Sequence, residues 1–218
     1  MLKEFWEPIQ LSISITLTAG IIVVIIGTVI GWLFATKTFK GKVFVETFLM
    51  LPLVLPPSVI GFILIIIFGN QSTFGQWIKW IFGQSIIFTW WAAVIAAIVV
   101  AFPLMFQSAK TGFQGVNQEL EEVAMDLGAS RLQTFLSISI PLASKSLLAG
   151  AILSFARALG EFGATLMFAG NIPGVTQTVP TAIYMAIDMN NMKMAWLWVI
   201  SIICLSFFML LFVQKKAK

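Results

Sequence analysis

Charged residues with a spacing that could support chemistry form two groups in this otherwise apolar chain. One group holds four acids: Glu119, Glu121, Glu122 and Asp126. The other is Arg157 with Glu161, which are four positions apart and so share one face of a helix, where they can pair. The chain has no histidine, and Cys204 is its one cysteine. These residues predict no metal site of His and Cys ligands, no disulfide framework and no cofactor.

Catalysis inside a membrane would need a nucleophile or an acid paired with a base. No Ser or Asp of the apolar segments has such a base beside it, and there is no His to supply one. We therefore expect that the chain is not an enzyme. The acidic group is then either a surface that another protein recognises or a solvated loop. For the function of the whole chain, an ion channel or a carrier that works without ATP is a further alternative.

The composition predicts a membrane protein. Of the 218 residues, 59% are hydrophobic and 10% are charged, whereas soluble domains carry about 25% charged residues. Such a chain cannot present a wet surface on all sides, so its main surroundings are lipid. The length suits one transmembrane domain, residues 1–218. The net charge of +4 reflects where Lys and Arg lie relative to the membrane, so it does not indicate a nucleic-acid partner.

Five apolar segments are each long enough for a helix to cross about 30 Å of hydrocarbon. They are Ile9–Ala35, Phe48–Phe68, Ile86–Phe106, Ser146–Phe168 and Ala195–Val213. Backbone groups in lipid must be paired internally, so these segments are helices, and the fold class is an all-α, polytopic transmembrane helical bundle. A further segment, Thr181–Met192, is short and polar. We expect five full spans with this segment as a re-entrant or partial helix; six spans is the alternative.

The positions of Lys and Arg predict the orientation. With five crossings, one side receives nine of the thirteen basic residues: Lys37, Lys40, Lys42, Lys110, Arg131, Lys145, Lys215, Lys216 and Lys218. Loops rich in Lys and Arg face the cytoplasm. The N-terminus is therefore expected outside, and the acidic group and the C-terminus are expected in the cytoplasm of a cell (plasma or inner) membrane. A sixth crossing would place the lysine tail on the opposite side.

The acidic group lies in a stretch with helical patterning. From Asn117 to Leu136, apolar residues can share one stripe, with the acids opposite. Gly128 is expected to break or bend this stretch, and Pro141 is expected to stop it before the fourth span. An amphipathic helix between two spans is suited to docking on another protein, but the patterning alone leaves a solvated loop equally open.

The spacing within this stretch resembles a family motif. Reading from Glu122, the chain gives E-V-A, three residues, Gly128, nine residues, then I-S-I-P ending at Pro141. This is similar to the EAA loop, E-A-A-x3-G-x9-I-x-L-P, of ABC importer permeases, with two mild replacements at Val123 and Ile140. The resemblance implies the type I (MetI-like) importer fold. It also implies a cytoplasmic coupling loop at about 110–143, which inserts into a groove of a separate ATP-hydrolysing subunit.

The resemblance assigns the coupling role to particular positions. They are Glu121, Glu122, Ala124, Asp126, Leu127, Gly128, Ala129, Arg131 and Pro141. The chain has no phosphate-binding G-x-x-x-x-G-K-[ST] loop. ATP is therefore expected to be bound by the partner subunit.

A second resemblance concerns the substrate. The run from Ala156 to Tyr184, "ARALGEFGATLMFAGNIPGVTQTVPTAIY", and the run "LPLVLPPSVIGF" from Leu51 to Phe62 are similar to molybdate-transport permeases. Sulfate permeases share the shorter "EFGA" part. The resemblance implies a permease for molybdate, with tungstate, sulfate or thiosulfate as alternatives, served by an extracytoplasmic binding protein. A five-span subunit is too small to enclose a path alone, so we expect a homodimer.

Prolines and neutral polar residues are candidates for the translocation path. Prolines in the second span free backbone carbonyls, which must face protein or water rather than lipid, and neutral donors suit weak contacts with a passing oxyanion. The candidates are Pro56, Pro57, Ser58, Thr165, Asn171 and Gln177. For Arg157 and Glu161, two roles are open: Arg157 attracts the anion, or the pair is a structural ion pair. We expect the structural role, since a strong fixed charge would hold a dianion too tightly.

Overall fold

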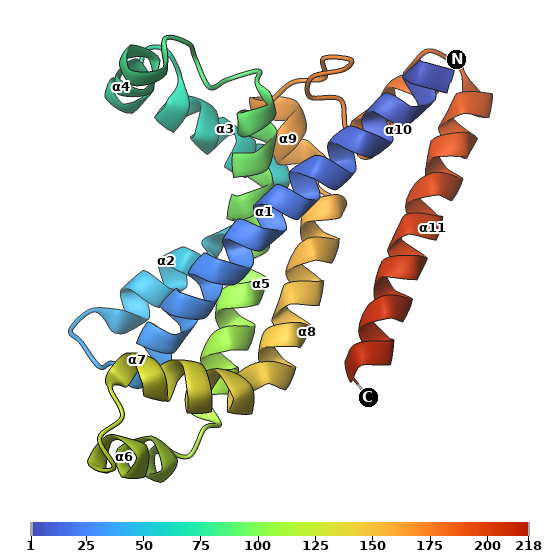
Figure 1. Ribbon diagram of the computed structural model, residues 1–218. Coiled ribbons are helices and arrows are strands. Elements are labelled where there is room, and N and C mark those ends of the chain that lie inside the picture. Colours follow the sequence, from blue (N-terminus) through green and yellow to red (C-terminus); the bar gives the residue numbers. More distant parts are fainter. Residues whose placement is uncertain (1, 218) are drawn as a thin grey trace.

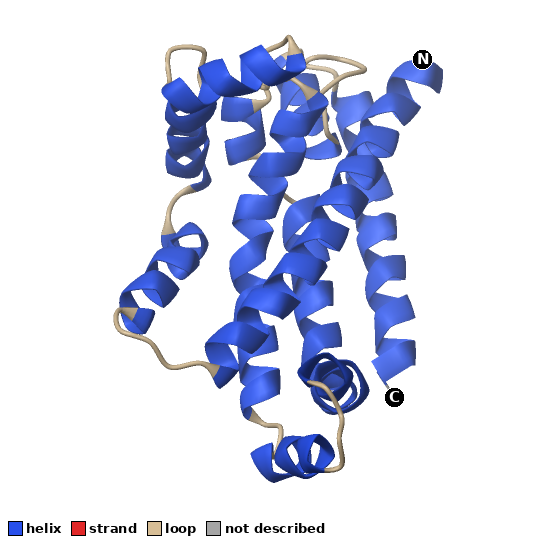
Figure 2. Cartoon of the chain, turned by 60° about the vertical axis from the view of Figure 1, so that its left-hand side comes forward, coloured by secondary structure: helices blue, strands red, loops and turns tan. Residues whose placement is uncertain are grey.

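The computed structural model describes the backbone of residues 2–217 and the side chains of residues 4–211. The described residues are helical with no strands (Figure 2), as expected for an all-α bundle. The elements are α1 (Leu2–Thr36), α2 (Lys42–Val54), α3 (Pro57–Phe68), α4 (Thr73–Phe82), α5 (Trp90–Gln114), α6 (Gln118–Asp126), α7 (Arg131–Thr134), the π-helix η1 (Phe135–Ser139), α8 (Ile140–Leu159), α9 (Gly163–Phe168), α10 (Val179–Asp188) and α11 (Met192–Ala217).

The core lies around α5, which packs between α1 and α8 (Figure 1). Its buried face is rich in small residues, including Ala93, Ala97 and Ala101, so the neighbouring helices can approach closely. At Gly31 of α1, an added Cβ would lie 2.6 Å from the Ala109 Cβ and 2.9 Å from the Lys110 backbone nitrogen. This close contact requires glycine, and it fixes α1 against α5.

In the described part of the chain, five passages connect the two ends of the bundle. Four helices there are long and apolar enough to span a membrane, within Glu4–Thr36, Trp90–Gln114, Arg131–Leu159 and Met192–Leu211. The bent pair α2 and α3 makes a fifth, because it leads from one end of the bundle to the other (Figures 1 and 2). As a result, α1 begins at one end of the bundle and α11 finishes at the other.

The second span differs from the single helix predicted over Phe48–Phe68. Here α2 ends at Val54, and α3 begins at Pro57 with a change in direction of 118°. Pro57 suits the first turn of a helix because it has no N–H to leave unpaired. It also disfavours helical geometry at Pro56, which is extended at ψ 139°. Two consecutive prolines therefore break the span instead of kinking it.

The fourth span also differs from its prediction, Ser146–Phe168. The helix begins earlier and ends at Leu159, and the chain turns at Gly160 before α9 resumes at Gly163. Our expectation that Pro141 would stop the preceding stretch is wrong, since α7, η1 and α8 form one helical run from Arg131 to Leu159. The π-turn ahead of Pro141 accommodates the proline, which cannot donate a backbone hydrogen bond.

Most of the short polar segment Thr181–Met192 belongs to α10, which covers ten residues, Val179–Asp188. At 1.5 Å per residue it is about 15 Å long, too short to cross a membrane, so the expectation of a partial helix is confirmed. Its first N–H, from Val179, donates to the Ser12 Oγ at 2.8 Å. The Trp198 Nε1 of α11 donates to the Phe5 carbonyl at 3.1 Å. These bonds join α10 and α11 to the start of α1.

Candidate functional site

Basic residues gather at one end of the bundle, which we call the basic end. It is formed by the last turn of α1, the start of α2, the end of α5, α6, α7 and the start of α8 (Figure 1). The residues there whose side chains are described are Lys37, Lys40, Lys42, Lys110, Arg131 and Lys145. Lys215 and Lys216 belong to α11, with side chains outside the described part, and Lys218 lies outside the described residues.

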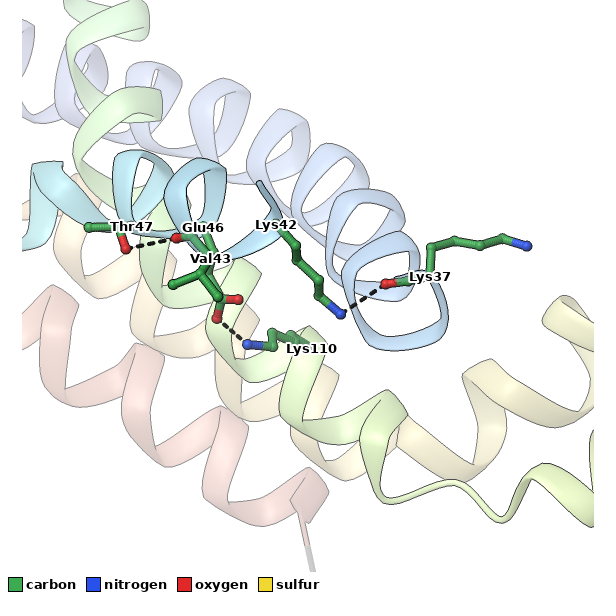
Figure 3. Close-up of polar contacts among 6 residues, drawn as sticks. All are labelled: Lys37, Lys42, Val43, Glu46, Thr47 and Lys110. Carbon is green, nitrogen blue, oxygen red and sulfur yellow. Dashed lines mark hydrogen bonds and ion pairs between the residues drawn. The ribbon is translucent and has the colours of Figure 1, made fainter. Parts of the chain in front are cut away.

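An ion pair fastens α2 to α5 at the basic end (Figure 3). The Lys110 Nζ donates to the Glu46 Oε1, and both side chains are largely buried. Nearby, the Lys42 Nζ donates to the Lys37 carbonyl at 2.9 Å, which closes the turn between α1 and α2. Sequence reasoning missed the ion pair, since its partners are 64 residues apart.

We predict that the pair of Glu46 and Lys110 stabilises the permease. Glu46→Gln or Lys110→Met should each lower the free energy of unfolding by about 1–3 kcal/mol, because a hydrogen bond to a charged group is lost in a partly buried place. Thermal unfolding of the purified permease measures this. The charge-reversed double variant, Glu46→Lys with Lys110→Glu, should recover most of the loss. Single variants that unfold at the wild-type temperature would contradict the prediction.

Helix α6 lies below the bundle in Figure 1 and carries the acidic group, of which Glu119, Glu122 and Asp126 are exposed. It begins at Asn117, whose Oδ1 accepts the Glu119 N–H at 3.0 Å, and none of its residues is buried. Its apolar side chains are nevertheless prominent: Leu127, just past its end, is 85% exposed and Val123 is 55% exposed. A helix that presents uncovered apolar groups beside acids has the character of a protein contact surface.

The end of α6 explains three positions of the sequence motif. Gly128 has the left-handed φ of +95°. Its N–H donates to the Met125 carbonyl, and the Ala129 N–H donates to the Ala124 carbonyl, both at 3.0 Å. This pairing is the Schellman motif, which needs glycine at the left-handed position and brings Ala124 and Ala129 together. These three residues therefore define how α6 ends and turns toward α7.

The next elements return the chain to the bundle. The Ser130 Oγ accepts the Gln133 N–H, and the Gln133 side chain accepts the Ser130 N–H, so a capping box starts α7. The Phe135 ring then lies between Trp32 of α1, with centroids 4.7 Å apart, and Phe113 of α5, at 5.9 Å. In Figure 1, α7 and η1 run crosswise to α8.

Most predicted coupling residues lie on this exposed surface. Those that are exposed are Glu122, Asp126, Leu127, Gly128, Arg131 and Pro141. Ala124 and Ala129 are half-buried at the helix end, and Pro141 lies apart from the others on α8. Glu121 is half-buried and turns inward, where its Oε1 accepts a hydrogen bond from the Ser139 Oγ. Sequence reasoning did not identify Ser139, and nothing in its local pattern marks it.

The break between α2 and α3 lies close to the break between α8 and α9, because α3 packs against α9. An added Cβ at Gly163 would lie 2.9 Å from the Pro57 Cβ, and one at Gly61 would lie 3.1 Å from the Ala164 Cα. The structure thus brings Pro57 and α9 together. Such broken helices expose backbone groups, which suits the wall of a polar passage.

The six path candidates fall into two places. Pro56, Pro57 and Ser58 are exposed at the start of α3, whereas Thr165 is buried in the adjoining α9. The other two lie in the loop between α9 and α10. The Asn171 Oδ1 there is buried with no hydrogen-bond partner among the described residues. Gln177 lines a cavity of ≈ 330 Å³ together with residues of α1, α10 and α11.

Arg157 and Glu161 form a pair where α8 ends. The Arg157 Nη1 donates to the Glu161 Oε2 at 2.7 Å, and the Glu161 Oε1 accepts the Ala164 N–H at 2.8 Å. The Glu161 residue is only 2% exposed, while the Arg157 side chain is 31% exposed. Glu161 therefore caps α9 and binds the last turn of α8 with one carboxylate. This geometry gives the pair a structural task at the break.

Comparison with known proteins agrees with this arrangement. Residues 8–215 match the family described as "Binding-protein-dependent transport system inner membrane component". YvgM of Bacillus subtilis (strain 168), named provisionally as a molybdenum transport system permease, is 61% identical over 214 residues, covering 98% of this chain and 94% of YvgM. The molybdenum transport system permease ModB of Escherichia coli (strain K12) is 40% identical over 183 residues, covering 84% of this chain and 80% of ModB.

A solved structure has the same fold. A chain of a bacterial ABC transporter involved in the import of the polysaccharide alginate aligns with a TM-score of 0.75 at 12% identity, covering 98% of this chain and 79% of that chain. At this identity the likeness concerns the fold alone. The family match over residues 8–215 identifies the chain as a member of the binding-protein-dependent transport system inner membrane components, which are non-catalytic membrane subunits of ABC importers.

Proposed function

We propose that this chain is the transmembrane permease subunit of an ATP-driven molybdate importer. The observation that carries the proposal is the 61% identity over 98% of the chain to YvgM, which is named provisionally as a molybdenum permease. The whole chain, residues 1–218, would act as one permease domain. Tungstate, sulfate and thiosulfate are tetrahedral dianions like molybdate, so permeases for these ions are the nearest alternatives.

The energy for transport would come from separate ATPase subunits bound at the basic end. The exposed surface of α6 supports this proposal, because its apolar and acidic side chains, such as Leu127 and Glu122, are uncovered. ATP would be bound by the partner, and the chain itself would carry no cofactor and catalyse no reaction. Basic residues gathered around α6 favour a cytoplasmic position for this end, with the start of α1 outside.

Two copies of the chain would form the path. The exposed start of α3, Pro56 to Ser58, would face it, and Thr165, Asn171 and Gln177 would support or approach it. Closed two-fold symmetry is the common solution for such assemblies. An extracytoplasmic binding protein would select molybdate and deliver it to the end opposite α6. The neutral groups near the path suit release of the ion after weak contacts.

Uptake of radiolabelled molybdate tests the proposal. The chain is co-expressed with the ATPase and binding protein encoded beside it and reconstituted in vesicles. We expect uptake that requires ATP, competes with tungstate and resists an excess of sulfate. Preferred uptake of sulfate would reject the substrate, and equal uptake without the ATPase or without ATP would reject the importer in favour of a channel or an independent carrier.

A further inference from the structure

The coupling helix α6 is tied to the bundle through one buried hydroxyl. No residue of α6 is buried, yet its Glu121 accepts a hydrogen bond from Ser139, which is 1% exposed and closes the π-turn η1. We infer that Glu121 and Ser139 form a joint that fixes the direction of α6 relative to α8. Glu121 is then a positioning residue and not a contact for the ATPase. This inference rests on the proposed function only for its consequence in transport.

The π-turn puts Ser139 within reach of α6. Pro141 has no N–H, so the regular α-helical bond to Ser137 cannot form. The chain widens instead, and the Ile140 N–H donates to the Phe135 carbonyl, five residues back. The Ser139 hydroxyl is thereby buried between α6 and the helical run, with the Thr134 carbonyl 3.5 Å away. The Glu121 carboxylate is the nearer acceptor of this hydroxyl, and a hydrogen bond to a charged acceptor is stronger than one to a neutral carbonyl.

The joint is anchored on its far side. Phe135 begins the same π-turn and packs against Trp32 of α1 and Phe113 of α5. The π-turn is therefore held by the ends of two spans, while Ser139 connects it to α6. Ser139 directly precedes the first residue of α8. A force on α6 would reach α8 at its first turn.

Adjacent glutamates of the motif then have different tasks. Successive residues of a helix point about 100° apart, and here Glu121 is half-buried toward Ser139 while Glu122 is exposed. Glu121 also borders a pocket of ≈ 200 Å³, whose lining includes Lys37 and Arg131. The Glu121 carboxylate is therefore engaged with Ser139, on the inner side of α6, whereas the Glu122 side chain is exposed.

Distances between spin labels on α6 and α8 test the joint. The chain has one cysteine, so a Cys204→Ser background accepts labels at Gln118→Cys on α6 and Ser144→Cys on α8, both exposed. The labelled chain is diluted into unlabelled chain in nanodiscs, so that most assemblies hold one labelled copy. Pulsed EPR then reports the distribution of distances within one chain.

We expect a narrow distribution in the wild type and a broad one in Ser139→Ala and Glu121→Ala. Loss of a hydrogen bond to a charged group should shift the balance between fixed and detached α6 by about tenfold or more. Glu121→Gln should stay narrow, since its amide oxygen still accepts the hydroxyl proton. Glu122→Ala should also stay narrow, as the matched control on the exposed side.

Two results would overturn the joint: a distribution in Ser139→Ala as narrow as the wild type, or a Glu121→Gln variant as broad as Glu121→Ala. If Ser139→Ala fails to reach the membrane, the comparison of Glu121→Ala, expected to be broad, with Glu121→Gln, expected to be narrow, still tests the joint. In the assembled transporter, ATP consumed per ion imported should rise in the two alanine variants and recover in Glu121→Gln. Failure of any ATPase to bind would reject the proposed function while the EPR result still decides the joint.

Discussion

Replacing Gly128 with valine is expected to reduce ATP-driven uptake by about tenfold or more while the protein still enters the membrane. Gly128 has a φ of +95°, where a side chain costs at least about 1–2 kcal/mol, and a β-branched one is a clear outlier. An added Cβ would meet nothing within 4 Å, so the strain is one of backbone only. Relief of the strain would undo the Schellman motif and turn α6 away from its partner.

Gly83 provides a matched control for this prediction. It also has a left-handed φ, +72°, and open space around its Cβ position, but it follows α4 at the end opposite α6 (Figures 1 and 2). Gly83→Val should therefore cost similar local strain and leave uptake near the wild-type rate. Uptake by both variants is measured in the same vesicles and normalised to the amount of permease. Equal rates for the two would count against a coupling role of α6.

Replacing Arg157 with alanine is expected to lower the free energy of unfolding by about 2–4 kcal/mol. The remaining Glu161 carboxylate would be buried with one N–H donor, from Ala164, and removal of one partner from a buried ion pair is strongly destabilising. The figure lies below the full range for buried pairs because the Arg157 side chain is 31% exposed. Thermal unfolding of the permease in nanodiscs measures it.

The Arg157→Ala variant also distinguishes a structural role of Arg157 from a role in binding the anion. If the pair is structural, Arg157→Ala lowers stability while the preference for molybdate over sulfate stays unchanged. Lys145→Ala, on the exposed face of the same helix, should leave stability within about 0.5 kcal/mol of the wild type. A normal unfolding temperature together with a raised KM for molybdate would show instead that Arg157 contacts the ion.

The number and nature of the spans could be predicted from the sequence, but two breaks could not. Composition over about 20 residues determines whether a segment can cross lipid, and this identified all five passages. Where a helix ends inside such a segment depends on local bonds that hydropathy does not register. The sequence predicts a single helix over Phe48–Phe68, although the chain turns by 118° at Pro56 and Pro57. The end of α8 depends on Glu161, whose side chain caps α9.

Only the local part of the candidate site could be predicted from the sequence. Ala124 and Gly128 are close in the sequence, so a motif can predict the helix end that they form. The hydrogen bond between Glu121 and Ser139 depends on a π-turn, which the hydrophobic periodicity does not predict. The ion pair of Glu46 and Lys110 depends on the packing of α2 against α5. Residues that meet across helices are beyond the reach of one sequence.

The π-turn also determines which residues of α8 face the core. One additional residue in a turn rotates everything that follows by about 100°. An added Cβ at Gly150 would meet Ser108, and the Ser154 Oγ donates to the Ala101 carbonyl, so both residues of α8 face α5. Deleting a single residue between Phe135 and Ser139 would therefore alter the facing surface of an entire span, although no residue of that span had been changed.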